Sequence, residues 1–178
     1  MNTTSTITTR CCYTFFLLLG LLFATACAKE DNWALNSVRS GSAPFSSTKL
    51  SYPAKDKING IGFELLSTSE KIRIYLNVHS EAVPAYEGDT QKALVRIATK
   101  NRKQVILAHR RSGGQRLLLP ESIYPFILAT LENGHSITFQ IPGYIATIEP
   151  EGFSKNFEKM QHPSRLQELS TRFESFDF

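Results

Sequence analysis

The chain has 178 residues, of which 42% are hydrophobic, 20% charged and 11% aromatic. This is enough for one globular domain with additional segments but too little for two full domains, and the composition excludes a disordered, collagen-like or coiled-coil chain. The three cysteines, Cys11, Cys12 and Cys27, all lie near the start. Residues 28–178 therefore offer no disulfide and no thiolate zinc site.

The first 26 residues have the pattern of a signal peptide. One basic residue, Arg10, precedes an apolar run of about 16 residues, which is shorter than the ~20 residues that a membrane-spanning helix needs. Ala24, Thr25 and Ala26 then supply the small residues that precede a leader cleavage site. We therefore expect residues 1–26 to be removed after export.

Cys27 follows this cleavage site directly, and residues 24–27 (Ala-Thr-Ala-Cys) resemble the lipobox of bacterial lipoproteins, in which leucine is the usual residue at the position of Ala24. The resemblance implies that Cys27 receives a diacylglycerol on its sulfur and, after cleavage, an acyl chain on its new amino group. Two or three acyl chains give an anchoring that one chain cannot give. Lipidation also explains the single cysteine, which in an exported chain is otherwise a free thiol.

Residue 28 is alanine rather than aspartate, which in lipoproteins of Gram-negative bacteria implies sorting to the outer membrane. Two alternatives remain open for the leader: a plain secretory signal followed by an incidental cysteine, and an uncleaved anchor helix.

Residues 28–57 show no apolar periodicity and are rich in Ser, Ala, Lys and Asp, with Gly41, Pro44 and Pro53 as breakers. They predict a flexible tether with a root-mean-square span of roughly 30 Å. Trp33 and Leu35 are expected near the bilayer surface, where tryptophan is common, with docking against another surface as the alternative. The expected organisation is a signal peptide over 1–26, a lipidated start and tether over 27–57, and one globular domain over 58–178.

From residue 58 onward, apolar and polar residues alternate in the manner of half-buried strands. Val105 and Leu107 are assigned to the inward face of the fourth strand, and turns are expected at residues 100–102 and 112–114, the latter because glycine adopts positive φ freely. Seven strands are predicted, over residues 61–65, 72–78, 92–99, 104–110, 115–119, 135–141 and 144–148.

Between the fifth and sixth predicted strands the apolar spacing becomes helical, with Ser122 as a candidate N-cap, Pro125 in the first turn and Gly134 as the stop. Two short helices are expected around residues 153–160 and 166–173. The predicted fold class is α+β: a mainly antiparallel β-sheet of about seven strands, with one crossover helix and short C-terminal helices. A β-sandwich is the alternative.

Motifs of catalysis or metal binding are absent from the sequence. The four histidines lie at no metal-ligand spacing, and the chain has no nucleophile elbow and no phosphate-binding loop. We therefore predict no catalytic residue, no metal and no cofactor. An exported or membrane-anchored hydrolase is the alternative function, and a glycosidase would need two carboxylates 5–10 Å apart.

The segment from Thr90 to Pro120 contains eight basic residues and no acidic one, although the chain after the leader has 19 basic and 16 acidic residues. Lysine and arginine on exposed strands discourage edge aggregation, and the same residues can form a surface for an anionic partner. The residues assigned to this anion-binding surface are Arg96, Lys100, Arg102, Lys103, Arg110, Arg111 and Arg116.

The function that these patterns favour is that of a lipoprotein held in the cell envelope by its N-terminal lipid, with a β-rich domain that binds or scaffolds. Its expected location is the outer membrane, facing the periplasm, or the cell surface. The expected partners are anionic headgroups, cell-wall acids or an acidic protein patch. Nucleic acid is not expected, because it is scarce outside the cytoplasm.

Overall fold

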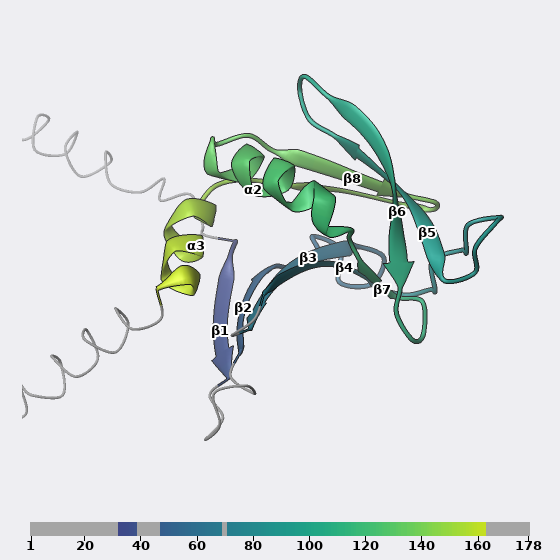
Figure 1. Cartoon of the computed structure of the whole chain (residues 1–178), viewed down its shortest axis with the longest axis horizontal. Helices are drawn as coiled ribbons and strands as arrows, with labels where there is room; N and C mark the ends of the chain where they lie inside the picture. The colour runs from purple at the N-terminus through teal and green to yellow at the C-terminus, as the bar shows by residue number, and fades with distance from the viewer. Residues whose placement is uncertain (1–31, 39–46, 69–70, 163–178) are drawn as a thin grey trace, which may run out of the picture. The chain divides into compact units, whose positions relative to one another are not determined.

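A computed structural model describes residues 32–38, 47–68 and 71–162 of the chain. Within these residues, nine strands form one antiparallel sheet in the order β1-β2-β3-β4-β7-β6-β5-β8-β9 (Figure 1). The β-rich α+β class is therefore confirmed, with two strands more than predicted. The strands are β1 (Ala34–Val38), β2 (Ser47–Tyr52), β3 (Ile61–Thr68), β4 (Ile72–Val78), β5 (Lys92–Ala98), β6 (Lys103–Arg110), β7 (Arg116–Leu118), β8 (Ile137–Ile141) and β9 (Tyr144–Ile148).

The two additional strands, β1 and β2, lie in the segment expected to be a tether, so that expectation is wrong for the described part of residues 28–57. Trp33 is also misplaced by the sequence analysis, because its side chain is only 5% exposed. Its indole N–H donates to the carbonyl oxygen of Glu149 at 3.1 Å, and its ring lies 5.2 Å from that of Tyr52 and 4.9 Å from that of Phe153. Trp33, Leu50 and Tyr52, from the described part of this segment, thus belong to the core of the domain.

The sheet curves until its two halves face each other. Phe63 on β3 stacks on Phe139 on β8 at 5.7 Å, although four strands lie between β3 and β8 in the sheet order. Both side chains are fully buried, and β3 also contacts β9. The core is therefore enclosed by one curved sheet, whereas the sandwich alternative required two.

Helix α2 (Tyr124–Glu132) follows the short 3-10 turn η2 (Glu121–Ile123), and Figure 1 shows α2 lying across the hollow side of the sheet. Ile123, rather than the predicted Ser122, occupies the N-cap position, without a side-chain cap. Pro125 lies in the first turn as predicted. Gly134 ends the helix at a φ of 75°, where the N–H groups of Gly134 and His135 donate to the carbonyls of Leu131 and Thr130.

Helix α3 (Phe153–Gln161) matches the first of the two short helices predicted after β9. Its buried residues include Phe153, Phe157 and Met160, and the first two stack at 5.2 Å. The second predicted helix, over 166–173, lies outside the described residues.

The predicted face of β6 is wrong. Val105 and Leu107 point away from the core, with 59% and 36% of their surfaces exposed, while Ala108 on the opposite face is fully buried. The flanking turns are confirmed: Thr99 donates its N–H to the Arg102 carbonyl at 2.8 Å, and Gly113 and Gly114 have φ values of 84° and 69°.

Candidate binding surface and pocket

The side of the sheet opposite the core, which we call the outward face, presents a continuous set of side chains across the strands. Cross-strand pairing places Ser51, Glu64, Tyr75, Leu118, His109 and Lys92 in one row. Residues paired directly across antiparallel strands have side chains on the same face of the sheet. This row and the rows two residues away on either side therefore make up the outward face.

The outward face is basic. Among the described strand residues, Glu64 is the one carboxylate on it, and its side chain is only 11% exposed. The basic residues on the same face are Lys49, Arg73, Lys92, Arg96, Lys103 and Arg116.

Five of the seven residues predicted to bind anions are exposed, namely Arg96, Lys100, Arg102, Lys103 and Arg111. Lys100 lies in the turn between β5 and β6, Lys103 begins β6, and Arg96 pairs with Val105 two residues further along that strand. These three residues, Arg96, Lys100 and Lys103, form what we call the basic turn cluster. Arg111 lies past the other end of β6, roughly 25 Å away at about 3.3 Å per residue.

The exposed Arg102 and the half-buried Arg110 and Arg116 also contact neighbouring groups of the domain. The guanidinium of Arg102 lies 5.0 Å from the ring centroid of Phe126 on α2. Arg110 donates from Nη1 to the Thr90 carbonyl at 2.8 Å and so braces the loop before β5. Arg116 forms an ion pair with Glu64. The exposed cations of the predicted surface thus lie near the two ends of β6, with Arg96, Lys100, Arg102 and Lys103 at one end and Arg111 at the other.

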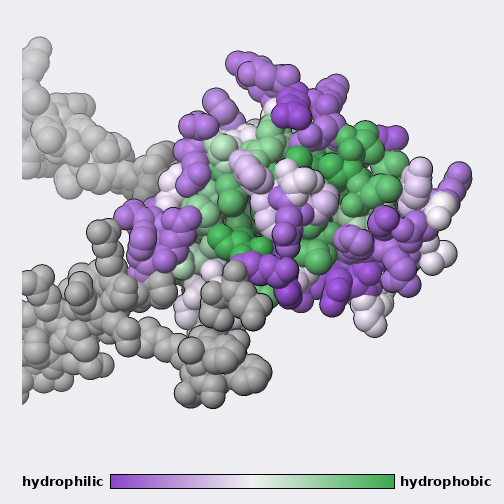
Figure 2. Space-filling model, viewed as in Figure 1, coloured by the Kyte–Doolittle hydropathy of each residue, from purple (hydrophilic) through white to green (hydrophobic). Residues whose placement is uncertain are grey.

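Apolar side chains accompany the basic turn cluster on the outward face. Val105, Arg96, Gln140 and Ile145 form a row across β6, β5, β8 and β9, and Ile145 is 69% exposed. Figure 2 shows hydrophobic surface bordered by hydrophilic residues on the part of the molecule where β5 and β6 lie. A surface that mixes exposed aliphatic and basic side chains can meet a partner that is both apolar and anionic.

Glu64 is the centre of a polar cluster on β3, β4 and β7. Its carboxylate is paired with the guanidinium of Arg116 and accepts a hydrogen bond from Nδ2 of Asn77 at 3.2 Å. The guanidinium carbon of Arg116 also lies 3.9 Å from the ring centroid of Tyr75. Planar guanidinium groups suit both contacts, because they pair with carboxylates and stack on aromatic faces.

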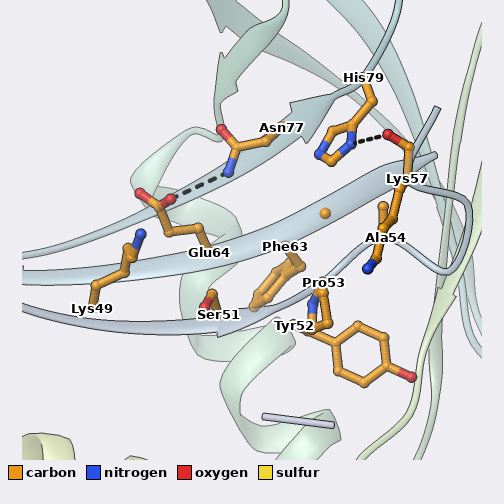
Figure 3. Close-up of a pocket in the computed structure, with 11 residues that line it drawn as sticks. Lys49, Ser51, Tyr52, Pro53, Ala54, Lys57, Phe63, Glu64, Asn77 and His79 are labelled. Atoms are coloured by element: carbon orange, nitrogen blue, oxygen red, sulfur yellow. Dashed lines mark hydrogen bonds between the residues drawn. The ribbon is translucent and has the colours of Figure 1, made fainter. Parts of the chain in front are cut away.

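A pocket of about 410 Å³ opens beside this cluster, and we call it the Gly62 pocket (Figure 3). Figure 3 shows Glu64, Asn77 and Lys49 on one side and Lys57 and His79 on the other. The residues that line it are Lys49, Ser51, Tyr52, Pro53, Ala54, Lys57, Gly62, Phe63, Glu64, Asn77 and His79.

Two hydrogen-bonded side chains fix the loop at this pocket. Nδ1 of His79 lies 3.0 Å from the Lys57 carbonyl oxygen, and because a carbonyl only accepts, Nδ1 carries the proton. The carboxylate of Asp56 accepts hydrogen bonds from the N–H groups of Ile58 and Asn59, which lower its pKa below the ordinary value. The sequence analysis missed this pocket, although the glycine within an otherwise regular strand was a signal for it.

Comparison with known proteins gives no relative: no family model, no curated protein and no solved structure matches the chain. Within the described residues, no helix is both long enough and apolar enough to cross a membrane. The same residues contain no group of three His, Cys, Asp or Glu side chains that could hold a metal ion.

Proposed function

We propose that the protein is a lipid-anchored lipoprotein of the bacterial cell envelope, and that its domain contacts the anionic headgroups of the membrane through the basic turn cluster. The lipobox-like residues 24–27 and the absence of cysteine from residues 28–178 support the anchor. The observation that carries the contact is the short distance along the chain between Cys27 and the buried Trp33.

Five residues separate Cys27 from Trp33. Even a fully extended chain spans at most about 3.6 Å per residue, so this link reaches roughly 20 Å. Because the indole of Trp33 is held by the carbonyl of Glu149, the lipid cannot lie far from the end of β9. The domain therefore lies close to the bilayer and is not suspended on a long tether.

The basic turn cluster lies at the same end of the sheet as Glu149. Thr147 on β9 pairs with Thr138 on β8, which pairs with Ala98 on β5. Ala98 in turn pairs with Lys103, the first residue of β6. The end of β9 that Trp33 contacts is thus at the same end as the turn of the β5–β6 hairpin that carries Lys100 and Lys103.

Headgroup contacts of this kind contribute about 1 kcal/mol for each Lys or Arg near an anionic surface. The effect falls off within a Debye length, which is ~10 Å at 0.1 M salt and ~3 Å at 1 M. Val105 and Leu107, exposed beside Arg96, add apolar area that can enter the headgroup region. The cluster orients a domain that the lipid already holds.

The anchor is tested by the substitution Cys27→Ser, with Cys12→Ser as the matched control. We expect the parent and Cys12→Ser proteins to enter the detergent phase on phase separation, because Cys12 leaves with the leader. The Cys27→Ser protein should be exported and remain aqueous. A parent protein that is itself aqueous would show that no lipid is attached.

The headgroup contact is tested with the soluble Cys27→Ser protein mixed with anionic or neutral vesicles. We expect binding to anionic vesicles at 0.1 M salt that is lost at 1 M salt and lost on changing Arg96, Lys100 and Lys103 to Glu. The control changes Lys55, Arg111 and Lys155 to Glu, which alters the net charge equally at exposed positions elsewhere. Equal binding to both vesicle types, or equal loss in both triple variants, would rule out the cluster as the contact.

The hydrolase alternative has no specific support from the geometry. Glu64 is the single carboxylate that lines the Gly62 pocket, and it is already bound by Arg116 and Asn77. A pair of carboxylates facing one another across a cleft would have favoured glycoside hydrolysis.

A further inference from the structure

We propose that the Gly62 pocket is a binding site for a small hydroxylated anion, such as a sugar acid or a sugar phosphate. This inference does not rest on the lipid anchor or on the basic turn cluster. It rests on a glycine that the fold does not require, on the polar groups around it, and on the net charge of the pocket.

Gly62 lies within β3 between the core residues Ile61 and Phe63. Its φ is not in the left-handed region, which among the glycines is occupied by Gly113, Gly114, Gly134, Gly143 and Gly152. A Cβ at Gly62 would meet the Tyr52 carbonyl oxygen at 3.5 Å, the Ala54 nitrogen at 3.6 Å and the Asn77 carbonyl oxygen at 3.8 Å, all ordinary contacts. Neither backbone conformation nor crowding therefore demands glycine at this position.

Glycine inside a strand is unfavourable, because it lacks a side chain to pack and has a low β-propensity. What glycine supplies at position 62 is open space on the outward face between Ser51, Glu64 and Asn77. Such a position is typical of a site where a ligand approaches the backbone closely. The volume of about 410 Å³ lies within the range of small-molecule sites.

The side chains around this space include both hydrogen-bond donors and acceptors. Lys49 and Lys57 offer ammonium donors on opposite sides of the pocket (Figure 3). The carboxylate of Glu64 and the second ring nitrogen of His79, which Figure 3 shows pointing away from the Lys57 carbonyl, offer acceptors. A ligand with several hydroxyl groups satisfies such a mixed lining, because each hydroxyl both donates and accepts.

The charge of the pocket favours an anionic ligand. Arg116 compensates the negative charge of Glu64, so the two lysines leave the lining positive. The nearby carboxylate of Asp56 is engaged by the N–H groups of Ile58 and Asn59. An anionic group placed between Lys49 and Lys57 would bring its hydroxyls toward Glu64 and His79.

The experiment is an NMR titration of the purified protein with glucuronate, glucose 6-phosphate and glucose. We expect the amide signals of Gly62 and Asn77 to shift with at least one of the two anions and much less with glucose, while Gly134 stays unchanged. A response to glucuronate alone identifies a carboxylate ligand, and a response to glucose 6-phosphate alone identifies a phosphate. No local response to either anion, or an equal response to glucose, would overturn the proposal.

Two pairs of variants locate the site. Gly62→Ala should weaken binding and Gly62→Val should abolish it, because each fills the space, whereas Gly88→Ala in an exposed loop should not change it. Lys57→Gln should weaken binding by about tenfold, the factor for one charge-assisted hydrogen bond, whereas Lys55→Gln should not. Unchanged binding in a folded Gly62→Val protein would show that the ligand binds elsewhere, and Gly62→Ala provides the same test should the valine variant fail to fold.

Discussion

Arg111 and Arg116 lie at the two ends of the turn between β6 and β7. Arg116 differs from Arg111 because a nearly buried carboxylate, that of Glu64, is paired with it. Its guanidinium is shared between the carboxylate of Glu64 and the ring of Tyr75. Glu64 is nearly buried, so its negative charge relies on Arg116 and Asn77 in place of water. Removing a partner from a buried charge costs more than the pair itself contributes, because the remaining charge keeps its desolvation penalty.

We therefore expect Arg116→Ala to destabilise the domain by about 1–3 kcal/mol. The exposed Arg111→Ala variant should stay within about 0.5 kcal/mol of the parent. Urea denaturation of the two variants measures the difference directly. If both variants unfolded at the same urea concentration as the parent, Glu64 would not depend on Arg116.

Asp89 lies in the turn before β5, and its pKa is lowered chiefly by the hydrogen bond and charge of Lys92, whose Nζ lies 2.9 Å away. The N–H of Gln91 adds a second hydrogen bond at 2.9 Å. A carboxyl group whose pKa is lower in the folded state stabilises that state above its unfolded pKa, and the contribution is lost as the pH falls through the folded value. The turn should therefore loosen in acid.

We expect Lys92→Gln to raise the pKa of Asp89 toward its ordinary value without fully restoring it, because Gln91 still donates. The pKa of Asp56 should not change, since backbone N–H groups of its own loop lower it. Carboxyl carbon shifts followed by NMR during a pH titration report both groups. An unchanged Asp89 in the variant would assign the whole shift to the backbone.

At the scale of elements, periodicity predicted seven strands and the two helices α2 and α3, because their apolar residues alternate or repeat with clear spacing. It missed β1 and β2, where polar residues dominate and few side chains are buried. In β2, Leu50 and Tyr52 alone are fully buried. β1 pairs with β2, and β2 pairs with β3. The hydrogen bond from Trp33 to Glu149 then joins this part of the sheet to a distant part of the chain.

The inward face of β6 could not be predicted because residues 105–108, Val-Ile-Leu-Ala, are all apolar. Such a run is consistent with either face. The sequence also could not show which basic residues are available to a partner. The charge count found the basic segment, but only the structure shows which of its cations, Arg102, Arg110 and Arg116, also contact neighbouring groups of the domain. The Gly62 pocket forms from strands and a loop that periodicity cannot bring together.

The domain boundary provides a test of β1 and β2. A protein that starts at residue 32 should unfold in one cooperative transition, and its melting temperature should not change with reductant, because it contains no cysteine. A protein that starts at residue 58 loses Trp33, Leu50 and Tyr52 from the core and should not fold, since each large buried side chain contributes about 2–5 kcal/mol. Circular dichroism melts compare the two. Cooperative unfolding of the shorter protein would show that β1 and β2 are accessory.

At the scale of the whole molecule, the domain combines two outward surfaces of different character. The basic turn cluster lies at the same end of β5, β8 and β9 as Glu149, whose carbonyl Trp33 contacts. The Gly62 pocket lies on β2, β3 and β4, in the other half of the sheet order. Under the two proposals made above, the first surface would orient the domain at the membrane, while the second would remain available to a small ligand.

The hydrogen bond from Trp33 to Glu149 joins residues 116 positions apart in the chain. During synthesis, Trp33 is therefore added to the chain long before its contact residues Glu149 and Phe153. Until then the aromatic side chains of Trp33, Tyr52 and Phe63 have no complete core to enter. Chains dominated by such distant pairings fold slowly and expose apolar surface meanwhile. The order of synthesis therefore means that the first strands cannot complete their packing until the residues of α3 have been made.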